Sequence, residues 1–582
     1  MLKLLIYLLA CLSAVLCMVP LNYEGGAPKG QPTRDVVVRL KGGVGPLKFA
    51  SDHGLHYKHQ VLKSAVDNVY LFQAKHENEL LGKKGKAFFA KMQANDGVEW
   101  IEHQIKTYKI PRADLSKRVP DPEYNKQWHL EGVPGVSLNV KAALKEGFDG
   151  TGVVVAIVDD GVDVKHPDLS VRLDRSLCWD FNDGHGTDCS PFLSDGHGTA
   201  AAGLAAAARN SVCGIGTASG ATLAGLRLIG GPTTDVVEAT ALSYKKDKIR
   251  VYSNSWGPID DGRHFSGPGR LTKLALRAGA TGGFGGKGNV YVWAAGNGRQ
   301  QKDNCNRDGY ANSRHTISVG AIDHRGVTAW YSEPCAELMV VVPSSGDKKG
   351  LVTSDLPGSS GYSAGDCTDH FGGTSGAAPQ VAGIVAVMLQ ARPDLTKRDV
   401  EGVLAKSAIR VNPANAGWVT NARNYHHHHD YGFGRIDMER TLRFTKEWAL
   451  LPPQKVCSIP LKRINRKIPY SMGMYGALQF DMDVSASCGV SFVEHIEVKT
   501  YIRHPHRGRV SVSIKGPEGA ISFLATPNSD YNVNYPIGGW TFGSVRHWGS
   551  RAQGRWTLFA HDSSTAYGQG TADWVQLTIY GH

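Results

Sequence analysis

The chain has 582 residues, of which 41% are hydrophobic and 20% are charged. This composition excludes a disordered chain, and the length predicts two or three domains. Of the formal net charge of +12, residues 18–118 hold +7, as 17 Lys and Arg against 10 Asp and Glu. Lys3 adds one, so only +4 falls to residues 119–582. The basic excess is thus concentrated in residues 18–118, and the rest of the chain is too weakly basic to indicate a nucleic-acid-binding function.

Residues 1–17 contain one lysine followed by a run rich in Leu, Ile and Ala. The run is too short to span a bilayer and predicts a secretory signal peptide. No later apolar run reaches about 18 residues, so we expect no transmembrane anchor in this chain. Cys11 and Cys17 fall in the signal, and the other eight cysteines allow four disulfides in an oxidising compartment. We therefore expect the protein in the lumen of the secretory pathway or outside the cell.

Residues 18–118 form the first predicted domain. Short β-like runs at 36–38 and 69–72 accompany a helical pattern at 87–92, which indicates a small α+β unit. The segment ends at the dibasic pair Lys117-Arg118. Taken alone, such a pair in a polar stretch is usually solvated surface charge.

Residues 119–448 alternate between strand and helix patterns. The unbroken β-branched run at 153–158 is typical of a buried parallel strand, and residues 289–295 form a second such run. An alanine-rich stretch at 200–208 predicts a helix. The pattern predicts an α/β domain, a parallel sheet flanked by helices, with the site on loops at the strand ends.

Three motifs in this domain carry chemistry. Asp159 follows the first strand, His197 stands between glycines at the start of the alanine-rich helix, and Ser375 lies in a Gly-rich turn before an apolar run. The order Asp, His, Ser is a known chain order for a catalytic triad. Ser375 would attack a carbonyl, His197 would take its proton, and Asp159 would hold the imidazole.

Two alternatives to this triad exist. Residues 183–187 repeat the Asp-Gly-His-Gly-Thr motif of residues 195–199, with His185 at the centre. A loop comes after His185, whereas a helix comes after His197, as the fold requires, so we prefer His197. Asp160, beside Asp159, is the alternative acid.

The C-terminal region has a different pattern. The Leu-Pro-Pro segment at 451–453 marks a boundary. Beyond it, runs such as 509–514 and 574–579 alternate with period two, and Gly, Pro and Asn turns separate them. Residues 449–582 are therefore predicted to form an antiparallel β-sandwich or jelly roll.

These motifs resemble those of the subtilisin superfamily. The segment Ser253 to Pro258 (SNSWGP) and the β-domain, which is similar to a P-domain, narrow the resemblance to the kexin/furin-like proprotein convertases. The resemblance implies a calcium-dependent serine endoprotease that cleaves precursor proteins after Lys-Arg or Arg-Arg pairs in the secretory pathway. Residues 18–118 would then be a prosegment that assists folding, inhibits the enzyme and is removed by self-cleavage after Arg118.

The resemblance also implies roles for residues outside the triad. Asn297 would donate a hydrogen bond to the oxyanion. Asp308 and Asp260 would bind the arginine just before the cut bond. Asp160 would bind the second basic residue of the substrate, and Glu238 would bind the substrate residue four positions before the cut bond. The full substrate-binding set is Asp160, Asp195, Glu238, Ser255, Trp256, Gly257, Pro258, Asp260 and Asp308.

Two calcium sites are implied by the same resemblance, since carboxylate and carbonyl oxygens suit this ion. The first would use Asp121, Asp168 and Asn210, with backbone carbonyls near Ala207, Val212 and Gly214. The second would use Asp260, Asp303 and Glu333. A third loop at 180–188 is only partly matched, because His185 stands where an oxygen ligand is expected.

The implied disulfides join Cys213 to Cys367, Cys305 to Cys335 and Cys457 to Cys488. Cys178 and Cys189 are left over, flanking the acidic 180–188 loop, and we expect them to pair with each other. The run His426–His429 could bind zinc, but we expect an exposed loop.

The sequence departs from the family pattern at Ser266, where furin-like members carry an acid for the fourth residue back. We therefore expect a weaker demand for a distal arginine. Two other functions compete. A broad-specificity degradative subtilase is disfavoured by the acidic set and the β-domain, and a non-catalytic binding relative by the complete catalytic set. We expect a monomer whose partners are dibasic precursors and its own prosegment.

Overall fold

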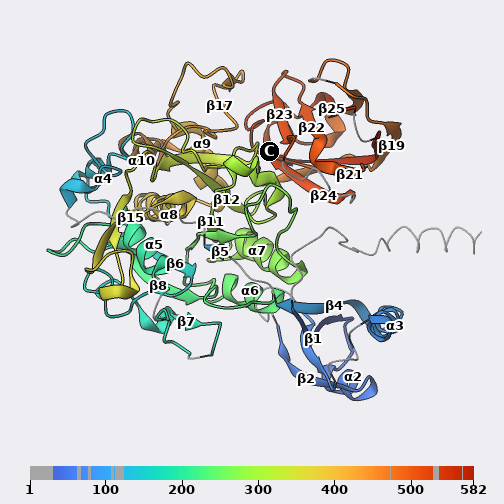
Figure 1. Ribbon diagram of the computed structural model, residues 1–582, viewed down its shortest axis with the longest axis horizontal. Helices are drawn as coiled ribbons and strands as arrows, with labels where there is room; N and C mark the ends of the chain where they lie inside the picture. Colours follow the sequence, from blue (N-terminus) through green and yellow to red (C-terminus); the bar gives the residue numbers. More distant parts are fainter. Residues whose placement is uncertain are drawn as a thin grey trace, which may run out of the picture.

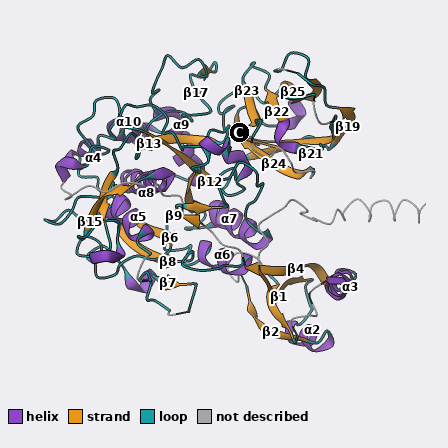
Figure 2. Ribbon diagram, in the orientation of Figure 1, coloured by secondary structure: helices purple, strands orange, loops and turns teal. Residues whose placement is uncertain are grey.

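The computed structural model describes residues 31–61, 67–76, 80, 82–106, 110–111, 124–184, 186–192, 195–471, 473–528, 536–565 and 568–582. The predicted signal peptide and the Lys117-Arg118 junction lie outside these residues. Figures 1 and 2 show three parts: a small N-terminal unit, a central α/β body and a C-terminal β unit. This arrangement confirms the predicted fold classes.

The N-terminal unit is a four-stranded antiparallel sheet in the order β2-β3-β1-β4 with two helices. Val36 and Val38 of β1 pack in a core beneath the helices, whereas Val37 points to the opposite face. On that face Trp100 packs against helices of the central body. The elements are β1 (Gln31–Leu40), α2 (Pro46–Asp52), β2 (Leu55–Gln60), β3 (Val69–Ala74), α3 (Gly82–Gln93) and β4 (Val98–Lys106).

The central body is built on a seven-stranded sheet in the order β13-β12-β11-β9-β6-β8-β7, in which all neighbouring strands are parallel. Its carboxyl edge therefore gathers the ends of several strands. The strands are β6 (Val154–Asp159), β7 (Trp179–Asp180), β8 (Thr222–Arg227), β9 (Val251–Asn254), β11 (Val290–Ala294), β12 (Thr316–Ile322) and β13 (Leu338–Pro343).

Helices cover both faces of this sheet, which explains why its strands are apolar on both sides. In β6, Val155 and Ile157 face the core of α5 and α8, whereas Ala156 and Val158 face the core of α6 and α7. Alternating side chains thus serve two different layers. The helices are α4 (Val140–Lys145), α5 (His197–Ala206), α6 (Asp235–Leu242), α7 (Arg270–Gly282), α8 (Gly373–Ala391), α9 (Lys397–Ser407) and α10 (Met438–Glu447).

Short strands complete the body and carry loops of the site. They are β10 (Trp256–Gly257), β14 (Leu351–Ser354), β15 (Cys367–Phe371), β16 (Val419–Thr420) and β17 (His426–His427). A further short strand, β5 (Ile110–Pro111), belongs to the N-terminal unit and pairs with β10. The four-histidine run does not form an exposed loop, and that prediction is wrong. His427 is 1% exposed and contacts the Leu338 carbonyl, while Nε2 of His429 accepts a hydrogen bond from the backbone of Phe523. The run therefore helps to join the central body to the C-terminal unit.

The C-terminal unit consists of two antiparallel sheets around one apolar core. In the first sheet β26 pairs with β18, β19 and β21, and β21 pairs with β24; the second has the order β20-β25-β22-β23. The strands are β18 (Lys455–Ser458), β19 (Lys462–Lys467), β20 (Leu478–Val484), β21 (Val493–Arg503), β22 (Val510–Lys515), β23 (Ile521–Ala525), β24 (Ile537–Ser544), β25 (Gly554–Asp562) and β26 (Thr571–Gly581).

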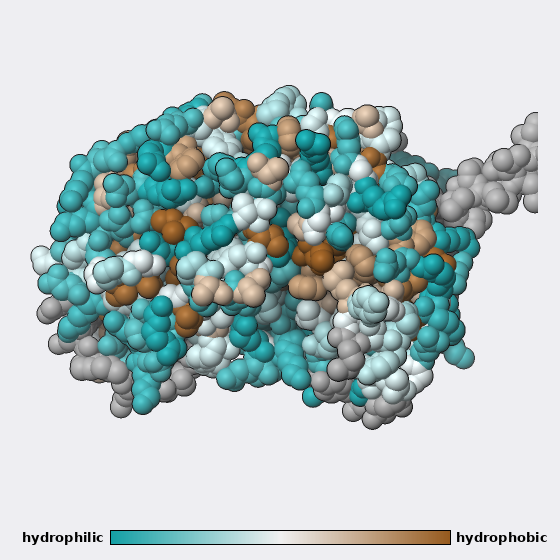
Figure 3. Space-filling model, turned by 90° about the horizontal axis from the view of Figure 1, so that it is seen from above, coloured by the Kyte–Doolittle hydropathy of each residue, from teal (hydrophilic) through white to brown (hydrophobic). Residues whose placement is uncertain are grey.

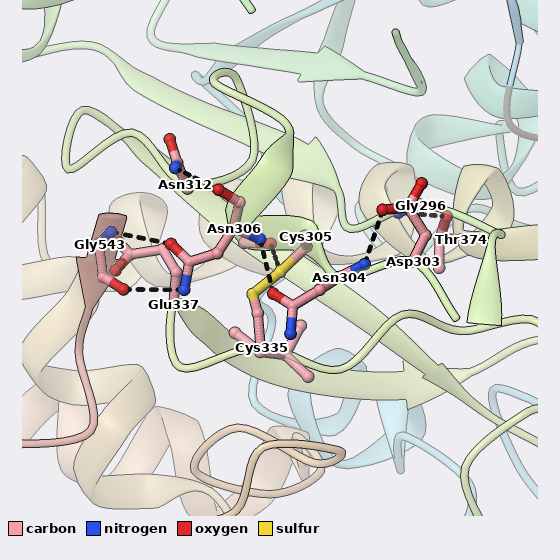
Figure 4. Close-up of a disulfide and its surroundings, with 12 residues drawn as sticks. Gly296, Asp303, Asn304, Cys305, Asn306, Asn312, Cys335, Glu337, Thr374 and Gly543 are labelled. Carbon is pink, nitrogen blue, oxygen red and sulfur yellow. Dashed lines mark hydrogen bonds between the residues drawn. A yellow bond between two sulfur atoms is a disulfide. The ribbon is translucent and has the colours of Figure 1, made fainter. Parts of the chain in front are cut away.

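Polar contacts fix this unit on the central body. Asn306 exchanges two hydrogen bonds with the backbone of Gly543, at 3.1 and 2.8 Å. Arg398 of α9 binds both carboxylate oxygens of Glu494, at 2.7 and 2.5 Å. Figure 4 shows Asn306 beside the Cys305–Cys335 disulfide, so a covalent crosslink braces the loop that holds Gly543.

Three of the implied disulfides are present, joining Cys213 to Cys367, Cys305 to Cys335 and Cys457 to Cys488. The fourth expectation is wrong in this structure: Cys178 and Cys189 are buried free thiols. Both sulfurs lie against Gly225, whose backbone N–H donates to Cys178 Sγ at 3.3 Å. That hydrogen bond and close packing accommodate the two thiols without a covalent bond.

The face of the molecule drawn in Figure 3 is mostly hydrophilic, with hydrophobic residues in scattered groups. Within the described part of the chain, none of the helices combines the length and apolarity needed to cross a bilayer.

Candidate active site

The predicted acid and base meet at the carboxyl edge of the sheet. Asp159 is the last residue of β6, and His197 is the first residue of α5. His197 Nδ1 lies 2.7 Å from Asp159 Oδ1, and both residues are almost fully buried. The contact fixes the ring so that Nε2 is the nitrogen left to accept a proton. Asp159, rather than Asp160, therefore occupies the position of the orienting acid.

Ser375 lies in the first turn of α8 and is fully buried. Its hydroxyl donates to the Ser255 carbonyl at 3.2 Å, while His197 Nε2 has no hydrogen-bond partner among the described residues. The hydroxyl must therefore rotate from Ser255 to His197 before it can lose its proton. The hydrogen bond between a nucleophile and its base is often absent or poorly aligned before substrate binds.

The two glycines before Ser375 are required by the backbone. Gly373 has φ +70°, a conformation that favours glycine. A Cβ on Gly372 would lie 1.9 Å from Ser345 Oγ. The Ser345 hydroxyl also accepts the Gly373 N–H at 3.0 Å. Ser345 thus supports the turn that presents the nucleophile, a role that the sequence motifs did not indicate.

Asn297 stands in the loop after β11. Its side-chain oxygen accepts hydrogen bonds from the backbone N–H and the hydroxyl of Thr374, at 2.9 and 3.0 Å. Its backbone N–H donates to Asp260 Oδ2 at 2.7 Å. With the oxygen held by the residue before Ser375, the NH₂ end of the amide is the end that can donate to a developing oxyanion.

Asp160 lies beside the triad and binds the start of α5. Its two oxygens accept the backbone N–H groups of His197 and Gly198, at 3.1 and 2.7 Å. Burial raises the pKa of Asp160 well above its usual value, and the nearby carboxylates of Asp159 and Asp195 raise it further. Burial likewise raises the pKa of Asp195. A basic substrate side chain placed beside these carboxyl groups would favour their ionised forms and so lower both pKa values.

The wall residues lie on β10 and its flanks. Trp256 is fully buried, and its indole N–H donates to the Val158 carbonyl at 2.8 Å. Ser255 Oγ donates to the Ser375 carbonyl at 3.0 Å, so this strand and the nucleophile are fixed to each other. Gly257 completes β10, and Pro258 comes directly after it.

The remaining acids lie near this wall. Asp308 is 6% exposed and accepts the Tyr310 backbone N–H at 2.8 Å. Glu238 is buried on α6 and accepts a hydrogen bond from the Tyr310 hydroxyl. Burial, followed by the charge of Glu238, raises the pKa of Tyr310 well above its usual value, so the phenol remains a donor. The structure thus connects Asp308 and Glu238 through one tyrosine that the sequence analysis did not single out.

Two residues of the second expected calcium cluster, Glu333 and Asp303, accept hydrogen bonds from loop backbone. The Gly298 N–H donates to Glu333 Oε1 at 2.9 Å, and the Gly262 N–H donates to Asp303 Oδ2 at 2.9 Å. Burial raises the pKa of Asp303 to about 6; Arg307 opposes the rise and Asp260 adds to it. Figure 4 shows Asp303 next to the disulfide loop. Among the described residues, the carboxylates of Asp260, Asp303 and Glu333 do not lie close enough together to form one group of metal ligands, so a cation site here stays a prediction.

The first expected calcium cluster is only partly described, because Asp121 lies outside the described residues. Asp168 is fully buried, and neither carboxylate oxygen makes a hydrogen bond of ordinary geometry. Burial raises its pKa to about 7, although the Asn210 side chain and the Gly214 backbone oppose this rise. Ala207 ends α5 next to this site, and Val212 donates to Asn210 Oδ1. A buried carboxylate with so few partners fits a ligand for a cation.

The third loop is organised by an arginine instead. Arg227, the last residue of β8, contacts Asp180 and Asp183 at 3.1 and 2.8 Å and donates to the Asp160 carbonyl at 3.2 Å. Its positive charge therefore balances the acids of this loop. The sequence analysis missed Arg227, although its position gave a signal: it is a charged residue at the end of an apolar strand, on the same edge as Asp159.

The N-terminal unit reaches the wall strand. Its short strand β5 pairs in antiparallel fashion with β10, with Ile110 opposite Gly257 and Pro111 opposite Trp256. A second contact buries Trp100, Val37 and Leu71 against α6 and α7. The edge of β10 that could bind an extended peptide is thus occupied by the chain's own N-terminal unit.

Comparison with known proteins gives two family matches, to the subtilase family over residues 150–434 and to the proprotein convertase P-domain over residues 493–579. Human proprotein convertase subtilisin/kexin type 7 is 36% identical over 505 residues, covering 84% of this chain and 63% of that protein. The dibasic-processing endoprotease of Yarrowia lipolytica is 36% identical over 466 residues, covering 80% of this chain and 48% of that protein. The PC3-like endoprotease variant B of Hydra vulgaris is 34% identical over 523 residues, covering 87% and 70%.

Among solved structures, a serine protease of Aeromonas sobria in complex with its chaperone has a TM-score of 0.71 at 23% identity, covering 81% of this chain and 97% of that one. At this identity the likeness concerns the fold alone. The chain spans 63% of the length of the human relative and about half that of the Yarrowia relative.

Proposed function

The chain belongs to the proprotein convertases of the subtilase family, and on this premise we propose that it is a calcium-dependent serine endoprotease that cleaves precursor proteins after paired basic residues. The observation that carries the proposal is the 2.7 Å contact between His197 and Asp159 at the carboxyl edge of the sheet, where α8 also begins with Ser375 in its first turn. The names of the human and Yarrowia relatives support this reaction and this specificity.

In the proposed reaction, Ser375 Oγ attacks the substrate carbonyl carbon while His197 Nε2 takes the hydroxyl proton. Asn297 stabilises the resulting oxyanion through its NH₂ group. The C–N bond then breaks, His197 gives the proton to the leaving amine, and an ester on Ser375 remains. His197 next takes a proton from water, whose oxygen attacks the ester carbon. The bond from that carbon to Ser375 Oγ then breaks, His197 returns the proton to Ser375 Oγ, and the new carboxyl terminus is released.

Specificity would come from the carboxylates around β10. Asp308 and Asp260 would bind the arginine before the cut bond, Asp160 with Asp195 the second basic residue, and Glu238 the fourth residue back. The raised pKa values of Asp160 and Asp195 support this assignment, because a bound cation would favour their ionised forms. Ser255, Trp256, Gly257 and Pro258 would form the wall along which the substrate backbone runs.

Calcium would be held by two groups of residues. Asp260, Asp303 and Glu333 would bind one ion, and Asp168, Asn210 and Asp121, with carbonyls near Ala207, Val212 and Gly214, would bind the other. When bound, the ions would balance the charge of clustered carboxylates and so fix the loops that carry Asn297 and Asp260.

We assign residues 1–17 to a signal peptide, 18–118 to a prosegment, 119–448 to the catalytic domain and 449–582 to the P-domain. The prosegment would inhibit by occupying the edge of β10, as the β5 pairing supports, and would be removed by self-cleavage after Arg118. The processed enzyme would act as a monomer in the secretory pathway. Wild-type protein should then begin at Val119 by N-terminal sequencing, whereas Ser375→Ala should keep its prosegment.

The test is a set of initial rates on fluorogenic peptides ending in Lys-Arg, Ala-Arg and Lys-Ala, each with and without EDTA, with Ser375→Ala as the blank. We expect fast, EDTA-sensitive cleavage of the Lys-Arg peptide alone. Similar rates on all three peptides would favour a broad degradative subtilase. No cleavage above the blank in processed protein would favour a non-catalytic binding relative.

A further inference from the structure

The short strand β19 (Lys462–Lys467, sequence KRINRK) is a row of positive charge on the P-domain. Five of its six residues are exposed, and only Ile464 is buried. Four of the exposed residues are cations: Lys462, Arg463, Arg466 and Lys467. Exposed cations usually lie near carboxylates that balance them, so the neighbours of this strand decide whether the charge is available.

Within the described part of the chain, none of the salt bridges includes any of these four side chains. Arg466 donates to a backbone carbonyl, that of Gln479, which carries no full charge. The nearest acids already have other partners: Asp573 on β26 binds Arg503 at 2.6 Å. Asp481 and Asp483 on β20 pair with Arg555 at 3.7 and 3.5 Å. Among the described residues, none of the four cations of β19 is therefore in direct contact with a carboxylate.

The position of β19 suits an extended ligand. It pairs with β26 along one side and has no second strand partner among the described residues, so it forms an edge of its sheet. Its register with β26 shifts between Arg463 and Arg466. Lys462 and Arg466 lie opposite Val575 and Ala572, whereas Arg463 and Lys467 lie opposite Trp574 and Thr571, so both faces of the edge carry two cations. Figure 1 shows β19 on the outer side of the P-domain, away from α5 and α8, which carry His197 and Ser375.

From these observations we propose that β19 is a binding site for a linear sulfated polysaccharide. Sulfate groups stay ionised at every physiological pH, and their spacing along a chain gives repeated charges for a row of cations. A membrane surface is a plane and gains little from one narrow row, and nucleic acid is not expected in the secretory pathway. Because β19 is remote from the triad, such binding would place the enzyme on a matrix or granule polymer and leave peptide hydrolysis unchanged.

Charged residues on an edge strand can instead serve only to prevent strand–strand aggregation. The test must separate a binding site from this role and from general positive charge. The patch variant is Lys462→Gln, Arg463→Gln, Arg466→Gln and Lys467→Gln. The matched control replaces four lysines of the catalytic domain, Lys141, Lys145, Lys165 and Lys248, with Gln. Both variants lose the same charge, and neither touches the active site.

Processed protein, free of its basic prosegment, is bound to immobilised heparin and eluted with a salt gradient. We expect the patch variant to bind at least about tenfold more weakly at low salt and to elute earlier, because screened ionic contacts dominate such binding. The control should elute with wild type, and all three should cleave the Lys-Arg peptide equally. The proposal is overturned if the patch variant elutes with wild type, if the control shifts as much, or if the wild type binds phosphatidylserine vesicles but not heparin.

Discussion

The same five residues, Asp-Gly-His-Gly-Thr, occur at 183–187 and at 195–199, and the fold uses the two copies differently. In the second copy His197 begins α5 and contacts Asp159 at 2.7 Å. In the first copy Asp183 turns to Arg227 at 2.8 Å. The difference arises from the element that comes after each copy: a helix directs the histidine to the end of β6, whereas a loop lets the acid meet a cation. A catalytic motif is thus defined by the element that carries it.

The largest effect should come from exchanging the two histidines for alanine. His197→Ala removes the only base in contact with Asp159 among the described residues, so kcat should fall by about 10⁴–10⁶. His185→Ala is the matched control and should keep wild-type activity. Both are measured as initial rates on the Lys-Arg peptide. Equal losses in the two variants would refute the assignment of His197.

The second prediction concerns the acids at the end of β6. Asp159→Asn should lower kcat by about 10⁴, because an amide at that place favours the wrong ring tautomer. Asp160→Asn should mainly reduce the preference for a second basic residue, with a much smaller loss on a peptide that has arginine alone. The values of kcat for each variant, on the Lys-Arg peptide and on the arginine-only peptide, decide which acid orients His197 and which binds substrate. If Asp160→Asn were the more damaging change on the arginine-only peptide, the acids would have to be reassigned.

The third prediction tests the structural role of the motif copy at 183–187, whose Asp183 contacts Arg227. Arg227→Gln should lower the free energy of unfolding by about 3–5 kcal/mol, because it leaves the buried Asp180 without its cation. Arg175→Gln is the control, since Arg175 and Asp188 are both exposed and 3.9 Å apart; it should change stability by less than about 1 kcal/mol. The midpoints of urea-induced unfolding measure the stability of both variants. An Arg227→Gln protein as stable as wild type would show that the loop does not depend on this network.

Asn297→Ala should lower kcat by about 10²–10³ with little change in KM, because it removes one oxyanion donor. Asn421→Ala, far along the chain in a loop that binds the Trp548 carbonyl, serves as a control and should leave kcat unchanged. A rise in KM at constant kcat would instead assign Asn297 to substrate binding.

The smallest effect should appear in the pH profile. Burial raises the pKa of Asp195, and Arg227 opposes the rise while Asp159 adds to it. Since only the ionised carboxylate attracts a basic side chain, kcat/KM for the Lys-Arg peptide should fall as pH falls through this raised pKa. Asp195→Asn should lower kcat/KM about two- to fivefold near neutral pH and flatten this limb. Asp183→Asn, in the motif copy at 183–187, should leave the pH profile of kcat/KM unchanged. If it changed the profile as much as Asp195→Asn does, the two copies would not differ in their contribution to specificity.

Local pattern was enough to predict the sheet and the contact between Asp159 and His197. The β-branched run at 153–158 predicted the buried strand β6, because helices cover both of its faces. The small residues around Ser375 predicted a tight turn, and Gly372 is indeed too close to Ser345 for any Cβ. These features depend on neighbours in sequence or on the hydrophobic period alone.

Features that depend on distant residues were not predicted. Arg227 joins Asp160 to Asp183, which lies 44 residues before it in the chain. His427 and His429 are polar, so the contacts of His427 with the Leu338 carbonyl and of His429 with Phe523 of the P-domain could not be inferred from composition. Likewise Cys178 and Cys189 were expected to pair because they flank a loop, whereas the packing around Gly225 accommodates both as thiols.

The central claim is that Ser375, activated by His197 and Asp159, is the nucleophile of this enzyme. A Lys-Arg peptide with a C-terminal diphenyl phosphonate tests it directly, with the labelled residue located by mass spectrometry. The account predicts one label per processed molecule, on Ser375, and loss of that label in both His197→Ala and calcium-free protein. A label on another residue, or none on fully processed wild-type protein, would contradict it.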